Sequence, residues 1–160
     1  MTSEWGLREL MKRGSIRPSP ADHRAAANLI RRASTDLRTA ERNLDHDPEC
    51  AFTYSYTSMM RSGLALMFSR GYRPVAANKH QTIVQFVSAT LDPKDEQIFS
   101  SFDLLRNKRN KFIYEPDLPC SYTEAKEALE IARQFVEVLA EVIDSKNGQG
   151  RLGFNEKKKK

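Results

Sequence analysis

Residues 105–114, which read LRNKRNKFIY, bring cations, amides and a phenol close together. In a helix, Arg106, Asn110 and Tyr114 follow one another at intervals of four residues, so their side chains share one stripe. A guanidinium, an amide and a phenol can all hydrogen-bond to phosphate oxygens. The stretch therefore predicts a phosphate-binding surface. The cations that we expect to contact RNA are Arg106, Lys108 and Lys111.

A plainer interpretation of the same stretch is a solvated basic face. With Arg109 it carries four cations, and the nearby Asp103 and Glu115 can neutralise only part of that charge. Exposed charges on a helix form local salt bridges that contribute little to stability. The sequence leaves both interpretations open.

The histidines do not suggest a metal centre. His23, His46 and His80 lack the spacing of metal ligands, and the sequence has no glycine-rich phosphate loop, GxSxG elbow or HExxH motif. We therefore expect no metal and no cofactor. His80 is expected to be a structural histidine, satisfied by a neighbouring backbone carbonyl or a carboxylate.

The net charge of +5 is concentrated at the two ends of the chain. Residues 1–18 hold four cations and two glutamates, and residues 145–160 hold six cations and one glutamate, so together they carry +7. Residues 19–144 are left with −2. Because the ends account for the high isoelectric point, the total charge is weak support for nucleic-acid binding.

The elements that must position the cationic stretch are helices, because apolar residues recur at helical spacing and no segment alternates like a strand. Start signals are Ser19 before Pro20, Asp47 before Pro48, and Ser121 with Glu124 as a capping box. The residues from Ile16 to Pro20 are predicted to be a linker. The predicted helices cover residues 4–13, 19–44, 47–70, 77–90, 92–114 and 121–146.

These helices predict an all-α fold, a compact up-and-down bundle of about five helices. Residues 1–18 are expected to be an N-terminal segment and linker, residues 19–146 the bundle, and residues 147–160 a disordered basic tail. Neither a membrane span nor a signal peptide is predicted, so we expect a cytoplasmic protein. Cys50 and Cys120 are expected to be reduced thiols.

The order of these features resembles the HEPN domain family over roughly residues 20–144. The resemblance depends on an aromatic, small and Met-containing helix ending in SRGYRP, on Lys79–His80, and on Arg109–Asn110 near a helix end. A Pro-containing loop and a final helix rich in Ala, Leu and Val follow. The resemblance implies a bundle of four or five helices that dimerises.

The resemblance also implies a site. Family ribonucleases cleave RNA without a metal, and each subunit brings an Arg-x(4–6)-His motif to a shared cleft. On this basis Arg109, Asn110 and Tyr114 are the candidate catalytic residues, but Tyr114 stands where the motif has its His. A phenol with a pKa of about 10 is ionised in only about one molecule in a thousand at pH 7, so it is a poor substitute base.

Three functions remain open at this point. The first is an RNA-binding or regulatory component of a toxin–antitoxin or defence-type system, a homodimer with a nucleotidyltransferase-type antitoxin partner and a degenerate ribonuclease motif. The second is an active, metal-independent endoribonuclease toxin. The third is a structural helical adaptor.

Overall fold

A computed structural model describes residues 3–75 and 77–147 of the chain. The prediction of an all-α fold is confirmed, because these residues are mostly helical and form a bundle with one small two-stranded sheet. The elements are α1 (Ser3–Lys12), β1 (Ile16–Pro18), α2 (His23–Asn43), α3 (Pro48–Ser69), β2 (Tyr72–Pro74), α4 (Lys79–Thr90), the 3₁₀ turn η1 (Pro93–Asp95), α5 (Glu96–Tyr114) and α6 (Tyr122–Asn147).

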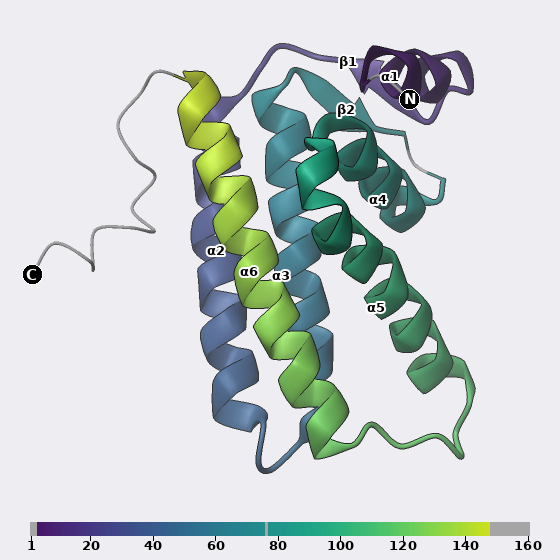
Figure 1. The fold of residues 1–160 in the computed structure, drawn as a ribbon, viewed down its shortest axis with the longest axis vertical. Coiled ribbons are helices and arrows are strands. Elements are labelled where there is room, and N and C mark those ends of the chain that lie inside the picture. Colours follow the sequence, from purple (N-terminus) through teal and green to yellow (C-terminus); the bar gives the residue numbers. More distant parts are fainter. Residues whose placement is uncertain (1–2, 76, 148–160) are drawn as a thin grey trace, which may run out of the picture.

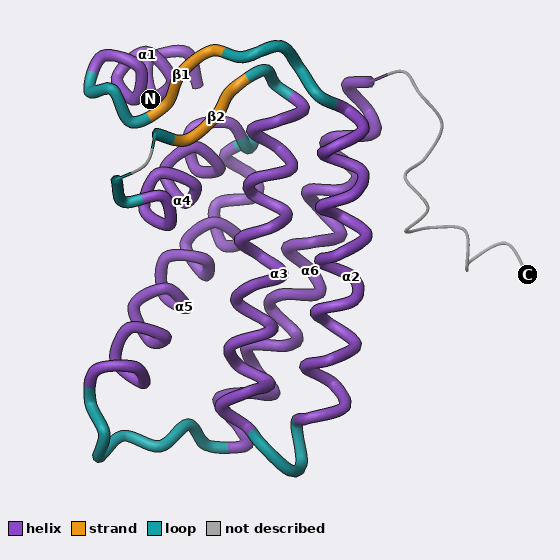
Figure 2. The backbone as a smooth tube through the Cα atoms, turned by 180° about the vertical axis from the view of Figure 1, so that it is seen from behind, coloured by secondary structure: helices purple, strands orange, loops and turns teal. Residues whose placement is uncertain are grey.

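Three long helices form the body of the bundle. Figure 1 shows α2, α3 and α6 running side by side, with α5 splayed away from them toward its C-terminal end. The view from behind confirms this arrangement and places the shorter α4 beside α3 and α5 (Figure 2). The interior between α3, α5 and α6 is aromatic: Phe102 lies 4.9 Å from Phe135 and 5.9 Å from Tyr56, measured between ring centres.

Two predicted helix starts are confirmed. Asp47 caps α3 by accepting a hydrogen bond from the Cys50 backbone N–H at 3.0 Å. Ser121 caps α6 through the Glu124 N–H at 3.1 Å. A side-chain oxygen at this position satisfies one of the backbone donors left open at a helix N-terminus.

The predicted start of the preceding helix at Ser19 and Pro20 is wrong. The cap is Asp22, whose carboxylate accepts from the Ala25 N–H at 2.9 Å, and α2 begins at His23. The Ser19 N–H instead donates to the carbonyl of Gly71 at 2.8 Å. A contact with a distant segment thus holds this stretch in an extended conformation.

The predicted linker at residues 16–20 contains a strand. Ile16–Pro18 pairs antiparallel with Tyr72–Pro74, so that Ile16 lies opposite Pro74 and Pro18 opposite Tyr72. Strands of three residues are too short to give an alternation pattern. This pairing ties the N-terminal segment to the end of α3.

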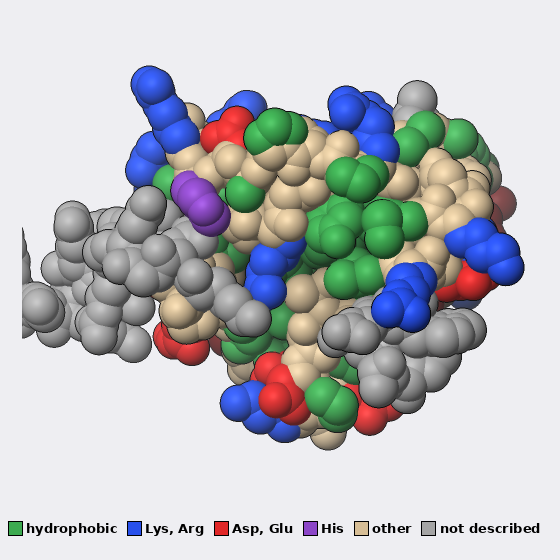
Figure 3. Space-filling view, turned by 90° about the horizontal axis from the view of Figure 1, so that it is seen from above, with side chains coloured by type: hydrophobic (Ala, Val, Ile, Leu, Met, Phe, Trp, Pro, Cys, Tyr) green, Lys and Arg blue, Asp and Glu red, His purple; other side chains and the backbone are tan. Residues whose placement is uncertain are grey.

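The first helix packs on α4. Leu10 is 4% exposed, and a Cβ built at Gly6 would lie 2.7 Å from the Ala89 Cβ, so α1 approaches α4 very closely. Figure 3 views this end of the molecule, where hydrophobic side chains gather between Lys and Arg side chains. The N-terminal segment therefore helps to cover α4.

The remaining predictions about the fold concern the cysteines and the end of the chain. Cys50 and Cys120 are free thiols, as expected. The predicted disordered tail, residues 147–160, lies outside the described residues except for Asn147, the last residue of α6. No helix in the described part of the chain has the length and apolarity needed to cross a bilayer.

Candidate nucleic-acid interface

The inward face of α5 carries a charge in an otherwise apolar row. Phe102 and Leu105 are 0% and 2% exposed, and the Phe112 ring packs edge-on against Phe52 with 5.0 Å between centres. Arg109 lies four residues after Leu105 and three before Phe112, which is the spacing of a core-facing helical stripe. The sequence therefore places a guanidinium where a bundle helix ordinarily has an aliphatic side chain.

This guanidinium lies over a buried phenol of α3. The Arg109 guanidinium carbon is 5.5 Å from the centre of the Tyr56 ring, within the range of a cation–π contact. Tyr56 is 1% exposed, and burial raises its pKa to about 12 even though Arg109 and Arg106 act in the opposite direction. Within the described residues, no carboxylate forms an ion pair with Arg109. Its charge is thus available to an external anion.

The Tyr56 hydroxyl contacts a histidine from α4. The hydroxyl oxygen is 3.1 Å from Nδ1 of His80, and the two ring centres are 5.7 Å apart. His80 is nonetheless an exposed residue, and none of the described residues hydrogen-bonds to its Nε2. The predicted partner, a backbone carbonyl or a carboxylate, is wrong: a tyrosine 24 residues away fills that role.

His80 is neutral near pH 7 because of its surroundings. Desolvation lowers its pKa below the ordinary 6.5, and the positive charges of Arg109 and Arg106 lower it further. Both effects disfavour the imidazolium ion. In the neutral ring one nitrogen carries a hydrogen and the other accepts a hydrogen bond, and the bond to Tyr56 influences which of these two tautomers forms.

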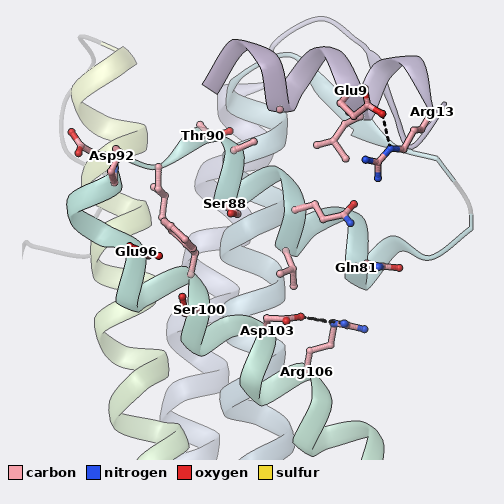
Figure 4. Close-up of a pocket in the computed structure, with 18 residues that line it drawn as sticks. Glu9, Arg13, Gln81, Ser88, Thr90, Asp92, Glu96, Ser100, Asp103 and Arg106 are labelled. Atoms are coloured by element: carbon pink, nitrogen blue, oxygen red, sulfur yellow. Dashed lines mark hydrogen bonds and ion pairs between the residues drawn. The ribbon is translucent and has the colours of Figure 1, made fainter. Parts of the chain in front are cut away.

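Arg106 belongs to the same end of α5 but is partly neutralised. Its Nε and Nη2 atoms donate to Oδ1 of Asp103 at 3.2 and 3.1 Å. In Figure 4 the Arg106 side chain extends toward the first turn of α4, where Gln81 lies. It is at the edge of a groove of about 1150 Å³ between α1, α4 and α5. Arg106 therefore borders both this groove and the cluster around Arg109.

The other predicted site residues lie elsewhere on α5. Tyr114 is 78% exposed in the last turn and lies five positions after Arg109, so the two side chains leave the helix about 140° apart. Asn110 and Lys108 are partly exposed, and Lys111 is exposed. The structure brings Arg106 and Arg109 together with Tyr56 and His80, but it does not bring Tyr114 to them.

Two members of this cluster, Tyr56 and His80, were not predicted as site residues, and the inward direction of Arg109 was not predicted either. Tyr56 is a buried residue of the helix rich in Met and aromatic residues, and the hydroxyl of a buried tyrosine needs a hydrogen-bond partner. Arg109 was grouped with its sequence neighbours, although its spacing from Leu105 and Phe112 gives it an inward direction. A cation within an apolar stripe, together with a buried hydroxyl without a local partner, is the signal that could have pointed to this site.

An all-α bundle with a half-buried arginine, a histidine and a tyrosine between three of its helices defines the class: a helical protein with a candidate anion-binding site. The HEPN domain matches residues 26–143, most of the chain. The protein belongs to the HEPN family, as its resemblance predicted. Comparison with curated proteins and with solved structures gave no significant match. The family includes ribonucleases of toxin–antitoxin and defence systems, and its members often dimerise and pair with nucleotidyltransferase antitoxins.

Proposed function

We propose that this HEPN protein is an RNA-binding, regulatory component of a toxin–antitoxin or defence-type system in the cytoplasm, with a degenerate ribonuclease motif. The motif is degenerate because Tyr114 stands in place of its His and lies apart from Arg109. RNA phosphates would be held by Arg109 and Arg106, with Lys108 and Lys111 adding positive charge along α5.

The position of Arg109 on the core-facing stripe of α5 is the observation that supports this proposal most. A positive charge on the core-facing stripe of a helix costs desolvation energy, which a salt bridge ordinarily offsets. Among the described residues Arg109 has no ion pair and lies over the face of Tyr56, and a cation–π contact contributes only about 0.5–2 kcal/mol. An arginine in such a place is better explained by an anionic ligand than by stability.

Partner binding is the second part of the proposal. We expect a homodimer and a nucleotidyltransferase-type antitoxin as partner. The C-terminal end of α5 and the loop after it expose Ile113, Tyr114 and Leu118 by 52%, 78% and 46%. Neighbouring exposed apolar side chains are typical of protein contacts. Sedimentation at micromolar concentration should give a dimer; a monomer would contradict this part.

An active endoribonuclease is the second candidate. The predicted catalytic set of Arg109, Asn110 and Tyr114 gains little support from the geometry, but His80 is an imidazole close enough to Arg109 for the arginine's charge to lower its pKa. Imidazole can accept and donate protons near neutral pH, which metal-independent RNA cleavage requires. This alternative therefore uses His80 where the motif has its histidine.

The test is binding of a fluorescent single-stranded RNA by wild type and by Arg109→Ala. We expect the variant to bind about tenfold more weakly, since one charge-assisted contact is lost. Arg38→Ala is the matched control, because Arg38 is an exposed arginine of α2 far along the chain from the site. No binding by any of the three proteins would favour the structural adaptor, and equal binding by all three would place the RNA elsewhere and contradict the proposed role of Arg109.

Incubation of the same RNA with excess chelator separates the two remaining functions. The regulatory proposal predicts intact RNA with wild type. Cleavage that disappears in Arg109→Ala and His80→Gln but persists in Tyr114→Phe would establish the ribonuclease with a relocated histidine. Cleavage lost in Tyr114→Phe would instead support the set of Arg109, Asn110 and Tyr114.

A further inference from the structure

We propose that Tyr56, His80 and Arg109 form a proton-linked phosphate site, in which a phosphodiester of single-stranded RNA bridges Arg109 and Nε2 of His80. Tyr56 is a positioning residue that holds the imidazole ring by its other nitrogen. The inference rests on the proposed RNA binding and gives that binding a specific ligand set and a dependence on pH.

The Tyr56 hydroxyl fixes the direction of the imidazole. This hydroxyl is buried, and Nδ1 of His80 at 3.1 Å is its hydrogen-bond partner within the described residues. A ring nitrogen held in this way orients the opposite nitrogen. Nε2 is therefore directed away from the Tyr56 hydroxyl, and because His80 is an exposed residue, a phosphate oxygen can reach this nitrogen.

A phenol suits both protonation states of the ring. When Tyr56 donates to Nδ1 of the neutral ring, the hydrogen of the imidazole is on Nε2, which can donate to a phosphate. When the ring becomes imidazolium, Nδ1–H donates to the Tyr56 oxygen and Nε2–H is still a donor. A carboxylate at the same place would have favoured a permanent positive charge, whereas the neutral phenol leaves the charge to the ligand.

The charges around His80 oppose protonation until an anion arrives. Burial lowers the pKa of His80 most, Arg109 and Arg106 on α5 lower it further, and Asp103 offsets part of the Arg106 charge. Lys79 precedes His80 on α4, and Tyr56 on α3 remains neutral because its pKa is raised to about 12. A phosphate between Arg109 and His80 would neutralise the dominant repulsion. Binding should therefore raise the pKa of His80 and take up a proton.

The sign of the pH dependence follows from linkage. If the complex binds one more proton than the free protein, affinity rises as pH falls through the interval between the free and the bound pKa of His80. The slope is at most about tenfold per pH unit for one proton. Below the free pKa the ring is already charged and the dependence ends. The RNA phosphodiester keeps one negative charge throughout, so the protein is the source of the effect.

The first experiment measures the affinity for a labelled oligouridylate from pH 8 to pH 5.5 at constant ionic strength. Wild type should bind about tenfold more tightly at the acid end. The RNA affinity of His80→Gln should not change with pH. Tyr56→Phe should keep its fold but lose most of the pH dependence of its affinity. The matched control is His46→Gln, which changes an exposed histidine in the turn between α2 and α3 and should behave like wild type. A dependence that survives in His80→Gln would overturn the proposal.

The second experiment keeps this site testable apart from RNA binding. Sulfate, whose charge does not change over this range, is titrated while NMR follows the imidazole of His80. Sulfate should raise its pKa in wild type and leave it unchanged in Arg109→Ala; no rise in wild type overturns the site. If RNA binding requires Arg109 but does not depend on pH or on His80, the proposed function stands and this inference is rejected. A sulfate response without RNA binding would keep an anion site at Arg109 and His80 but would reject RNA as its ligand, and with it the proposed function.

Discussion

The Arg109 guanidinium carbon lies 5.5 Å from the centre of the buried Tyr56 ring, so the core-facing stripe of α5 carries a charge between Leu105 and Phe112. This places the proposed RNA contact partly inside the bundle. Function and stability should therefore respond in opposite directions when the charge is removed.

Replacing Arg109 with leucine separates the two effects. Arg109→Leu fills the same apolar row without a charge to desolvate, so we expect the free energy of unfolding to stay equal or rise by about 1 kcal/mol. RNA affinity should fall about tenfold. Chemical denaturation and RNA titration of the same preparation measure both quantities. A loss of more than about 1 kcal/mol would mean that Arg109 mainly supports the fold.

The ion pair between α2 and α3 predicts that removing its arginine destabilises the protein more than removing its carboxylate charge. Arg61 Nε lies 2.9 Å from the Asp36 carboxylate, whose side chain is 8% exposed. Desolvation raises the pKa of Asp36, although Arg61 and Arg32 lower it. Arg61→Met should destabilise by about 3 kcal/mol at pH 7.5, since a charge is left buried without its partner. Asp36→Asn should cost less than about 1 kcal/mol, because it removes that charge.

The pH dependence of the destabilisation provides a control for this ion pair. A carboxyl group whose pKa is raised in the folded state takes up its proton there first. The destabilisation of Arg61→Met should therefore shrink as pH falls toward 3.8, the ordinary value for Asp36. Equal losses in both variants at all pH values would contradict this account.

Gly63 sets the distance between α3 and α4. A Cβ at this position would clash with the Ile83 side chain and lie 3.2 Å from a Val87 methyl. Gly63→Ala should lower the free energy of unfolding by about 2 kcal/mol even though alanine is the better helix former. Because α4 also carries His80, the variant should lose pH-dependent RNA binding. Thermal unfolding and RNA titration measure the two effects; an increase in stability would show that α4 adjusts freely.

His80 also predicts how stability depends on pH without RNA. Its pKa is lowered in the folded protein, so below 6.5 the unfolded chain takes up this proton first. Wild type should lose stability as pH falls from 7 through 6.5 toward the folded pKa. His80→Gln should lose less over that range, and His46→Gln should follow wild type. Denaturation curves at pH 7.5 and 5.5 give the comparison; parallel losses in all three would refute it.

Local signals allowed most of the helices to be predicted. Asp47–Pro48 and Ser121 act through hydrogen bonds to backbone groups three residues away, so their effect can be derived from neighbouring residues. Ser19 and Pro20 give the same signal but start no helix. There the Ser19 N–H bonds to Gly71, and the Asp22 N–H bonds to the carbonyl of Phe68.

The candidate site was predictable only on its α5 side. Arg106 and Arg109 stood out because they are close in sequence, and helical periodicity could have given the direction of Arg109. The bond from Tyr56 to His80 joins two helices and spans 24 residues, so no local pattern indicates it. Tyr114 was chosen by its position in a motif, and the geometry of α5 directs it elsewhere.

The most direct test of the central claim is the dependence of single-stranded RNA affinity on salt, for wild type and for Arg106→Ala/Arg109→Ala. Each phosphate contact by a cation adds about 0.7 to the slope of log affinity against log salt concentration. We predict a slope shallower by about 1.4 in the double variant, together with weaker binding at every salt concentration. An unchanged slope would contradict the account, because RNA would then be bound elsewhere on the protein.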